Sequence, residues 1–164
     1  IQANPLADAL IYMQYGPSQP EFLDIAGSDA EGYVWSTVLG VYSDDKGKEF
    51  RAKYKERFPG TMGLVYTGMG YDVVYMLKNA WEAVGDPENF SAVNKYIEEN
   101  HYRGVNGWYM LDNDCHCTPA YPDEVDSIEK GMAHLFFQVQ NGEHKIIAPD
   151  PLIESAFRPA PWMN

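Results

Sequence analysis

The chain has 164 residues, which is enough for one ordinary domain with a hydrophobic core of its own. Its net charge of -12 argues against binding to nucleic acid or to an anionic membrane surface, because phosphate contacts need clusters of Lys and Arg that this sequence lacks. No apolar run approaches the ~20 residues that span a bilayer, and no signal peptide precedes Ile1, as expected of a mature or truncated chain.

The first predicted elements are a strand, a loop and a short helix. Residues 9–13 are apolar and aromatic and read as a buried strand, which Pro17 breaks. Ser18 and Glu21 then have the spacing of a capping box, and Gly27 ends the helix that follows. A strand therefore leads through a loop into a helix.

This loop is a candidate ligand site. In open α/β sheets ligands bind at such junctions, because the unpaired N–H groups and the positive end of the helix face the crevice. Tyr15 could provide an aromatic wall, and Gly16 and Ser18 could make polar contacts with a zwitterionic ligand. The alternative is that Ser18 only caps the helix and Tyr15 only packs.

The next two elements are a strand and a surface helix. Residues 33–38 are β-branched and aromatic, which predicts a strand. A polar turn at 43–47 begins a helix on which Phe50, Tyr54 and Phe58 form one aromatic stripe. Basic and acidic residues are interleaved around the stripe, which indicates a solvated face rather than a phosphate site.

A second candidate ligand segment is the glycine-containing loop at 66–71. Its two glycines would let the backbone approach a ligand closely. Met69 lies in this loop, and Tyr66, Tyr71 and Asp72 could present rings and a carboxylate to a ligand ammonium. The alternative for Asp72 is that the helix dipole favours a carboxylate in a first turn without any ligand.

Two helices and a strand follow. Residues 72–84 form an amphipathic helix, with an apolar face made of Val73, Val74, Leu77, Ala80, Trp81 and Val84. Gly85 ends it, and Asp86 and Pro87 supply a cap and a first turn for a second helix, lined by Phe90, Val93 and Ile97. A short strand at 108–111 completes a layer of an α/β domain.

The segment after this strand contains possible metal ligands. Cys115, His116 and Cys117 could bind zinc or copper, but a structural zinc site needs a second pair of ligands, and nothing in the sequence places His134 or His144 nearby. A disulfide between the two cysteines would close a small, strained ring. The thiols could instead pair with cysteines elsewhere or stay free, and no cofactor is expected.

The last part of the chain reads as a loop and a hairpin. Residues 118–131 are rich in Pro and acid and predict a long loop. Asn141-Gly142 between the strands 134–140 and 143–148 predicts a hairpin with a two-residue turn. No nucleophile elbow, phosphate loop or His-Glu-x-x-His motif occurs, so the sequence does not indicate an enzyme.

Several stretches together carry a resemblance to a known family. The runs 70–72, 80–87 and 102–107 resemble the distal part of a type 1 periplasmic substrate-binding protein, with the branched-chain amino acid receptors of ABC importers as the nearest group. Residues 14–32 and 136–149 match as well, in the order of the family. Because members of the family are much longer and have two lobes, the resemblance implies the C-terminal half of such a protein.

The resemblance implies an α/β fold that is part of a two-lobed type 1 periplasmic-binding-protein fold, with Rossmann-like lobes and a hinge. Residues 1–59 would belong to the second lobe, 60–112 to the first, and 113–164 would form the hinge crossover, the hairpin and a tail returning to the second lobe. The tail 157–162 would lie extended against the body. The family also places ligand contacts in the loop around Ser18 and near the helix start that follows residue 66.

The implied function is that of a periplasmic or extracellular solute-binding receptor of an ABC importer, which binds an amino acid or a similar small polar ligand between two lobes. Its partners would be the ligand, the membrane subunits of the importer, and the missing N-terminal half or a companion chain. One alternative is a ligand-sensing regulatory module with the same fold. Another is a metal-dependent enzyme built on Cys115, His116 and Cys117.

Overall fold

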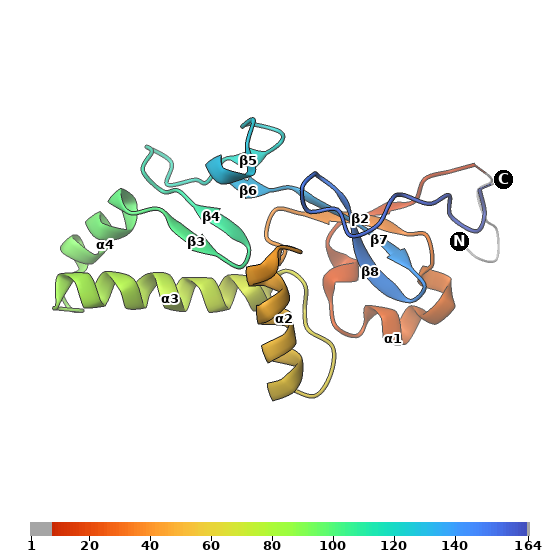
Figure 1. The fold of residues 1–164 in the computed structure, drawn as a ribbon, viewed down its shortest axis with the longest axis horizontal. Coiled ribbons are helices and arrows are strands. Elements are labelled where there is room, and N and C mark those ends of the chain that lie inside the picture. The colour runs from red at the N-terminus through yellow and green to blue at the C-terminus, as the bar shows by residue number, and fades with distance from the viewer. Residues whose placement is uncertain (1–7, 164) are drawn as a thin grey trace.

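The computed structural model describes residues 8–163 and shows an elongated molecule. In Figure 1 a four-stranded sheet with helix α1 occupies one end, helices α3 and α4 occupy the other, and α2 lies between them. The helices are α1 (Phe22–Ala26), α2 (Asp45–Arg57), α3 (Tyr66–Val84) and α4 (Phe90–Glu99), with 3-10 turns η1 (Gly16–Ser18), η2 (Gly27–Ala30) and η3 (Ile128–Lys130). The strands are β1 (Tyr12–Met13), β2 (Val34–Thr37), β3 (Tyr102–Gly104), β4 (Gly107–Tyr109), β5 (Ala120–Tyr121), β6 (Met132–Ala133), β7 (Leu135–Gln140) and β8 (Glu143–Ala148).

The main sheet has the strand order β1-β2-β7-β8. Strand β1 runs parallel to β2, whereas β7 runs antiparallel to both β2 and β8. Trp35 on β2 lies opposite Phe137 on β7, and the two rings stack with their centroids 4.3 Å apart. This pair lies in the core, together with Tyr42, Val65, Ala133, Leu135, Ile146 and Leu152. The segments 33–38 and 134–148 therefore belong to one sheet, although about a hundred residues separate them along the chain.

The predicted hairpin is confirmed. Strands β7 and β8 are joined by Asn141 and Gly142, which both have positive φ, 56° and 74°. Both residues adopt the left-handed conformation that a two-residue type I′ turn requires. The carboxylate of Glu31 accepts hydrogen bonds from the N–H groups of Asn141 and Gly142, at 2.9 and 3.3 Å, and so ties the turn to the start of β2.

The beginning of the chain differs from the prediction. Strand β1 has only two residues, and Leu10 and Tyr12 are exposed, because β1 lies at the edge of the sheet. The capping box also does not form. Ser18 lies in η1, and α1 begins at Phe22 with no side chain bonded to its first turn. Gly27, with φ of 54°, ends α1 as predicted.

Residues 66–71, expected to be a loop, are the first turns of α3. The reason is packing: a Cβ on Gly68 would lie only 2.1 Å from Asn106 Oδ1 and 2.5 Å from Val41 Cγ2, so this glycine lets α3 approach both segments. Gly85 ends α3 in the left-handed conformation, as predicted. Helix α4 is capped by Asn89 and not by Asp86, since Asn89 Oδ1 accepts a hydrogen bond from Ala92 N.

The apolar faces of the two long helices are only partly covered. Ala80 on α3 and Val93 on α4 are buried, as expected, but Val74, Trp81 and Phe90 are exposed. Among the described residues, no helix is both long and apolar enough to cross a membrane.

The region after α4 is more ordered than expected. Strands β3 and β4 form an antiparallel hairpin, which includes the first half of the predicted strand at 108–111. The expected loop 118–131 contains β5, which pairs in parallel with β6, and the turn η3.

The C-terminal tail lies extended against the body, as expected. Gln138 Oε1 accepts from Arg158 N at 3.0 Å, while Gln138 Nε2 donates to Arg158 O at 2.8 Å. Trp162 Nε1 donates to Ala9 O at 2.8 Å, so the tail also holds the segment before β1. The division into lobe segments 1–59, 60–112 and 113–164 stays a prediction.

Candidate ligand site

Turn η1 and the start of α3 line a common cavity of about 210 Å³. Its walls are formed by Ser18, Gln19, Pro20, Tyr54, Gly63, Val65, Tyr66 and Thr67. The backbone N–H of Leu64 donates to Ser18 O at 3.2 Å, which fixes the two segments relative to each other. The structure thus brings Ser18 and Tyr66, expected near the ligand from separate stretches of sequence, to one place.

Ser18 has an unusual environment in this cavity. Its side chain is only 3% exposed, and its Oγ has no hydrogen-bond partner within residues 8–163. The backbone N–H of Ser18 donates to Tyr15 O at 3.0 Å and closes η1. A buried hydroxyl without a partner costs free energy, so this position of Ser18 is unfavourable within the described part of the chain. The alternative that Ser18 only caps a helix is wrong, since its side chain caps none.

The cavity also meets the N-terminus of the long helix α3. Val65 is the N-cap residue, and no side chain accepts a hydrogen bond from the first turn of α3. The first N–H groups of a helix have no partner inside the helix, and they carry the positive end of its dipole. None of the residues that line the cavity is charged.

The other residues expected to contact a ligand do not line this cavity. Tyr15, just before η1, and Gly16, its first residue, are exposed, and Met69 is half-buried on α3, but none of them lines the cavity. Tyr71 faces a second, open cavity of about 520 Å³ between α2 and α3, where its ring packs 4.9 Å from that of Phe50. That cavity also contains the aromatic stripe of α2.

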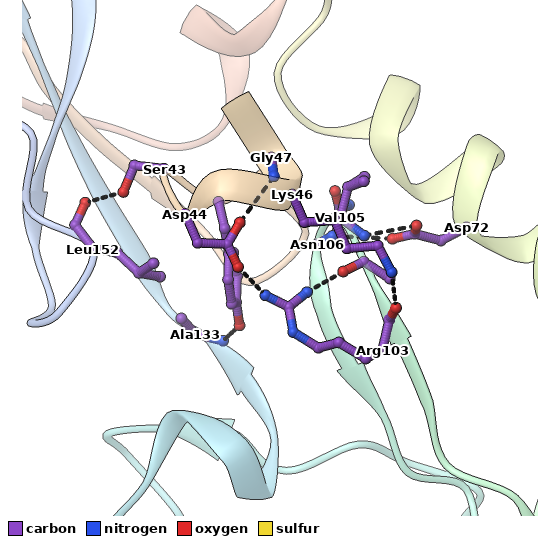
Figure 2. Close-up of polar contacts among 12 residues, drawn as sticks. Ser43, Asp44, Lys46, Gly47, Asp72, Arg103, Val105, Asn106, Ala133 and Leu152 are labelled. Carbon is purple, nitrogen blue, oxygen red and sulfur yellow. Dashed lines mark hydrogen bonds and ion pairs between the residues drawn. The ribbon is translucent and has the colours of Figure 1, made fainter. Parts of the chain in front are cut away.

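Asp72 has a structural role within the described residues, and its expected contact with a ligand stays a prediction. It is fully buried on α3, and its carboxylate accepts hydrogen bonds from Val105 N at 2.7 Å, Asn106 N at 3.0 Å and Tyr109 Oη at 3.2 Å (Figure 2 shows the two backbone bonds). Burial raises the pKa of Asp72, although the three donors lower it. The carboxylate therefore holds the turn of the β3–β4 hairpin on α3.

A polar joint, formed by Tyr42, Asp44, Arg103 and Ala133, connects α2 with the β3–β4 hairpin (Figure 2). Asp44 caps α2, because its Oδ1 accepts from Gly47 N at 2.8 Å, and its Oδ2 pairs with Arg103. The Arg103 guanidinium also lies 4.9 Å from the centre of the Tyr42 ring. Tyr42 Oη accepts from Ala133 N at 2.5 Å, and burial raises the Tyr42 pKa to about 12. The joint thus links α2, the hairpin and β6.

Nothing in the sequence pattern pointed to this joint. Asp44 could be recognised as a helix cap, but its second partner, Arg103, lies 59 residues further along the chain. Only the folded chain brings these groups together.

The cysteine loop is exposed and internally bonded. Cys115 and Cys117 are free thiols: Cys115 Sγ donates to Asn113 Oδ1 at 3.1 Å, and Cys117 Sγ donates to Cys115 O at 3.0 Å. Within the part of the chain that the structure describes, no group of three or more His, Cys, Asp or Glu side chains could hold a metal ion. The structure does not bring His134 or His144 into such a group.

One cluster has the contacts of a Ser-His-Asp triad. Ser36 Oγ lies 2.9 Å from His134 Nε2, and His134 Nδ1 lies 2.7 Å from Asp123 Oδ2. However, Ser36 is a buried residue within β2, its hydroxyl also bonds to Tyr12 Oη at 2.7 Å, and it lines none of the cavities described here. A nucleophile must reach its substrate, so this cluster is a link between β1, β2 and the segment after β5.

The chain is similar to several proteins of known structure. No protein-family model matches the chain, and no curated protein matches it either. A Silicibacter pomeroyi protein assigned as a branched-chain amino acid ABC transporter is 31% identical, with a TM-score of 0.83, and the match covers 99% of this chain and 43% of that protein. A leucine-binding protein from Thermotoga maritima is 21% identical, with a TM-score of 0.56, over 85% of this chain and 37% of that one.

A solute-binding protein of a Rhodopseudomonas palustris ABC transporter, solved in complex with benzoate, is 13% identical, with a TM-score of 0.57, over 83% of this chain and 38% of that one. The two more distant matches show the fold alone. The chain spans less than half the length of each of these proteins. The expected fold class and the resemblance are confirmed: the chain carries part of the type 1 periplasmic binding protein fold, as it occurs in the branched-chain amino acid receptors and related ligand-binding receptors.

Proposed function

We propose that the chain is part of an extracytoplasmic receptor that binds an amino acid or a similar small polar ligand between two lobes. The closed receptor then delivers the ligand to the membrane subunits of an ABC importer. The observation that carries the proposal is the cavity that Ser18 of η1 and the first residues of α3 line together. The solved neighbours support it, since they are transport and solute-binding proteins, one of them holding benzoate.

The chain spans less than half the length of its solved neighbours, and a two-lobed receptor would contain further structure. Val74 and Trp81 lie seven residues apart on one face of α3 and are 63% and 45% exposed. Such a row of exposed apolar side chains on a helix is typical of a surface that another element covers. We infer that the rest of the receptor, either as a preceding segment or as a companion chain, packs on this face of α3.

Thermal unfolding with candidate ligands tests the proposed function. The chain is purified together with any polypeptide that accompanies it, and its midpoint of unfolding is measured with leucine, isoleucine, valine and benzoate. A ligand at about a hundred times its Kd stabilises the folded protein by about 2.7 kcal/mol, which raises the midpoint by several degrees. Titration calorimetry should then give a stoichiometry near one. If the complete preparation binds none of these compounds, the proposal is wrong for this ligand class.

A further inference from the structure

We propose that Cys115 and Cys117 form a reversible dithiol–disulfide pair, which is oxidised by exchange with a small disulfide that carries positive charge. This inference goes beyond the proposed function and does not depend on it, since neither cysteine lines the cavity between η1 and α3. The two thiols have no part in ligand binding at that cavity, so the two proposals stand or fall separately.

The two thiols lie next to each other on one surface loop. Both are free and exposed, and only His116 separates them along the chain. The Cys115 thiol hydrogen-bonds to the Cys117 thiol, and this contact raises the pKa of Cys117. His116 adopts the left-handed conformation, with φ of 49°, and turns the chain between the two cysteines. A disulfide forms only between sulfurs that can meet, and these two are already in contact.

The side chain of Asn113 holds both cysteines in place. Its Oδ1 accepts from Cys115 Sγ and from Cys117 N, both at 3.1 Å, and its Nδ2 donates to Cys117 O at 2.8 Å. The base of the loop is closed separately, because Thr118 Oγ1 accepts from Met110 N at 3.0 Å. A disulfide would replace the thiol hydrogen bonds to Asn113 Oδ1 and Cys115 O and leave this closure intact. Oxidation would therefore change the loop and not the fold.

The exchange takes place in two steps. The thiolate of one cysteine attacks a sulfur of the small disulfide, which releases one small thiol and leaves a mixed disulfide. The second cysteine then attacks the cysteine sulfur of the mixed disulfide, so that the Cys115–Cys117 bond forms and the second small thiol leaves. Two cysteine thiols are oxidised, one small disulfide is reduced, and the two protons end on the released thiols. Because the new ring is small, strained and exposed, an excess of small thiol reverses the reaction.

The surroundings of the loop are acidic. Beside it lies an open cavity of about 610 Å³, and among the described residues no Lys or Arg lines this cavity. Its lining includes four carboxylate side chains, those of Glu98, Glu99, Asp112 and Asp114. One of them, Asp112, pairs with His101 Nε2 at 3.1 Å. A negative potential attracts cations and repels anions, so a disulfide with ammonium groups should reach the thiols more often than one with carboxylates.

Mass spectrometry of the reduced native receptor preparation tests the pair. The preparation is incubated with cystamine, which carries two ammonium groups, or with 3,3′-dithiodipropionate, which carries two carboxylates, and is then quenched and alkylated. We expect this chain to lose the mass of two hydrogen atoms and to show no alkylation of Cys115 or Cys117. An excess of cysteamine should restore both thiols.

The two disulfides also differ in intrinsic reactivity, because their leaving thiols have different pKa values. Each rate is therefore divided by the rate of the same disulfide with the amide of N-acetylcysteine, which is uncharged apart from its thiol. We expect the normalised rate with cystamine to be at least about tenfold higher than that with 3,3′-dithiodipropionate. Equal normalised rates would overturn the preference for a positively charged disulfide.

Three other products would contradict the pair itself. A chain that keeps one or two cysteamine groups would show that the ring does not close. A cross-link to a companion polypeptide or to a second copy would show that the thiols pair elsewhere. A disulfide that resists an excess of cysteamine would be structural and not reversible.

Variants of the loop provide the controls. Cys115→Ser and Cys117→Ser should each stop at the mixed disulfide, because the second thiol is missing. Asn113→Ala should slow ring closure about tenfold, since the side chain that holds both cysteines is lost. Its matched control is Asn94→Ala, at an exposed position on α4 outside the loop, which should close at the wild-type rate. Equal rates in the two Asn variants would overturn the role assigned to Asn113.

Discussion

His144 is a half-buried residue that packs on the core residue Trp35. It lies on β8, and its Nδ1 accepts a hydrogen bond from Trp35 Nε1 at 3.0 Å, so the proton of the neutral ring must be on Nε2. Its ring packs edge-on against Trp35, with the centroids 5.5 Å apart. Burial lowers the pKa of His144 to about 4, so the ring is neutral at pH 7.

This burial predicts a pH dependence of stability. The unfolded chain protonates His144 near pH 6.5, whereas the folded chain does so only near pH 4. Between these values the unfolded state binds more protons, so the free energy of unfolding falls as the pH drops from about 6.5 to 4, by at most about 1.4 kcal/mol per unit. Above pH 6.5 this contribution is fully present. Urea unfolding at several pH values would measure it.

The matched variant for this prediction is His144→Gln, because an amide oxygen can still accept from Trp35 but does not titrate. Other groups also titrate below pH 6.5, so the difference in free energy of unfolding between wild type and variant is the quantity to follow. It should shrink or reverse as the pH falls. A difference that is constant from pH 7 to 4 would contradict the assignment.

Helix α3 illustrates how tertiary contacts decide where an element begins. Its first turns contain Gly68 and Gly70, which are poor helix formers, and the sequence pattern therefore predicted a loop. The two glycines differ in their surroundings: a Cβ on Gly68 would meet Asn106 Oδ1 at 2.1 Å, whereas nothing lies within 4 Å of a Cβ on Gly70. The first glycine is required by packing and the second is not.

Because of this difference, replacing glycine with alanine should have opposite effects on stability at positions 68 and 70. Gly70→Ala should stabilise the chain by about 0.5–1 kcal/mol, since alanine is the better helix former and meets no obstacle. Gly68→Ala should destabilise it by about 1–3 kcal/mol, because α3 would have to move away from Asn106 and Val41. Urea unfolding of the two variants gives the comparison. Equal effects at both positions would mean that α3 does not contact Asn106 as described.

On the scale of the whole molecule, the uncovered face of α3 predicts association. If the rest of the receptor packs there, a charge on this face should weaken the association without unfolding the chain. Trp81→Glu should lower the amount of companion that accompanies the chain in native mass spectrometry by about tenfold or more.

The control for this experiment is Asn79→Glu, which places the same charge on α3 at an exposed position on another face. Circular dichroism should show that both variants keep their helix content. Equal retention of the companion by the two variants would contradict the assignment of this face. If no companion is present, the same pair of variants should be compared for self-association.

The sequence by itself determined those features that depend on neighbours along the chain. Asn141-Gly142 predicts the β7–β8 hairpin because a type I′ turn needs two residues with positive φ, and Gly85 ends α3 for a similar local reason. The collinear stretches also indicated the family and the two segments that meet at the cavity between η1 and α3. These signals did not depend on distant contacts.

Only the tertiary structure decided which candidate side chains are free to meet a ligand. Ser18 and Asp72 were both candidates in the sequence, but within residues 8–163 folding leaves the Ser18 hydroxyl without a partner and surrounds the Asp72 carboxylate with three donors. Those donors come from residues 105–109, more than thirty positions away. Burial and hydrogen bonding are properties of the whole fold, so a local pattern could identify the polar groups but not which of them the chain itself would satisfy.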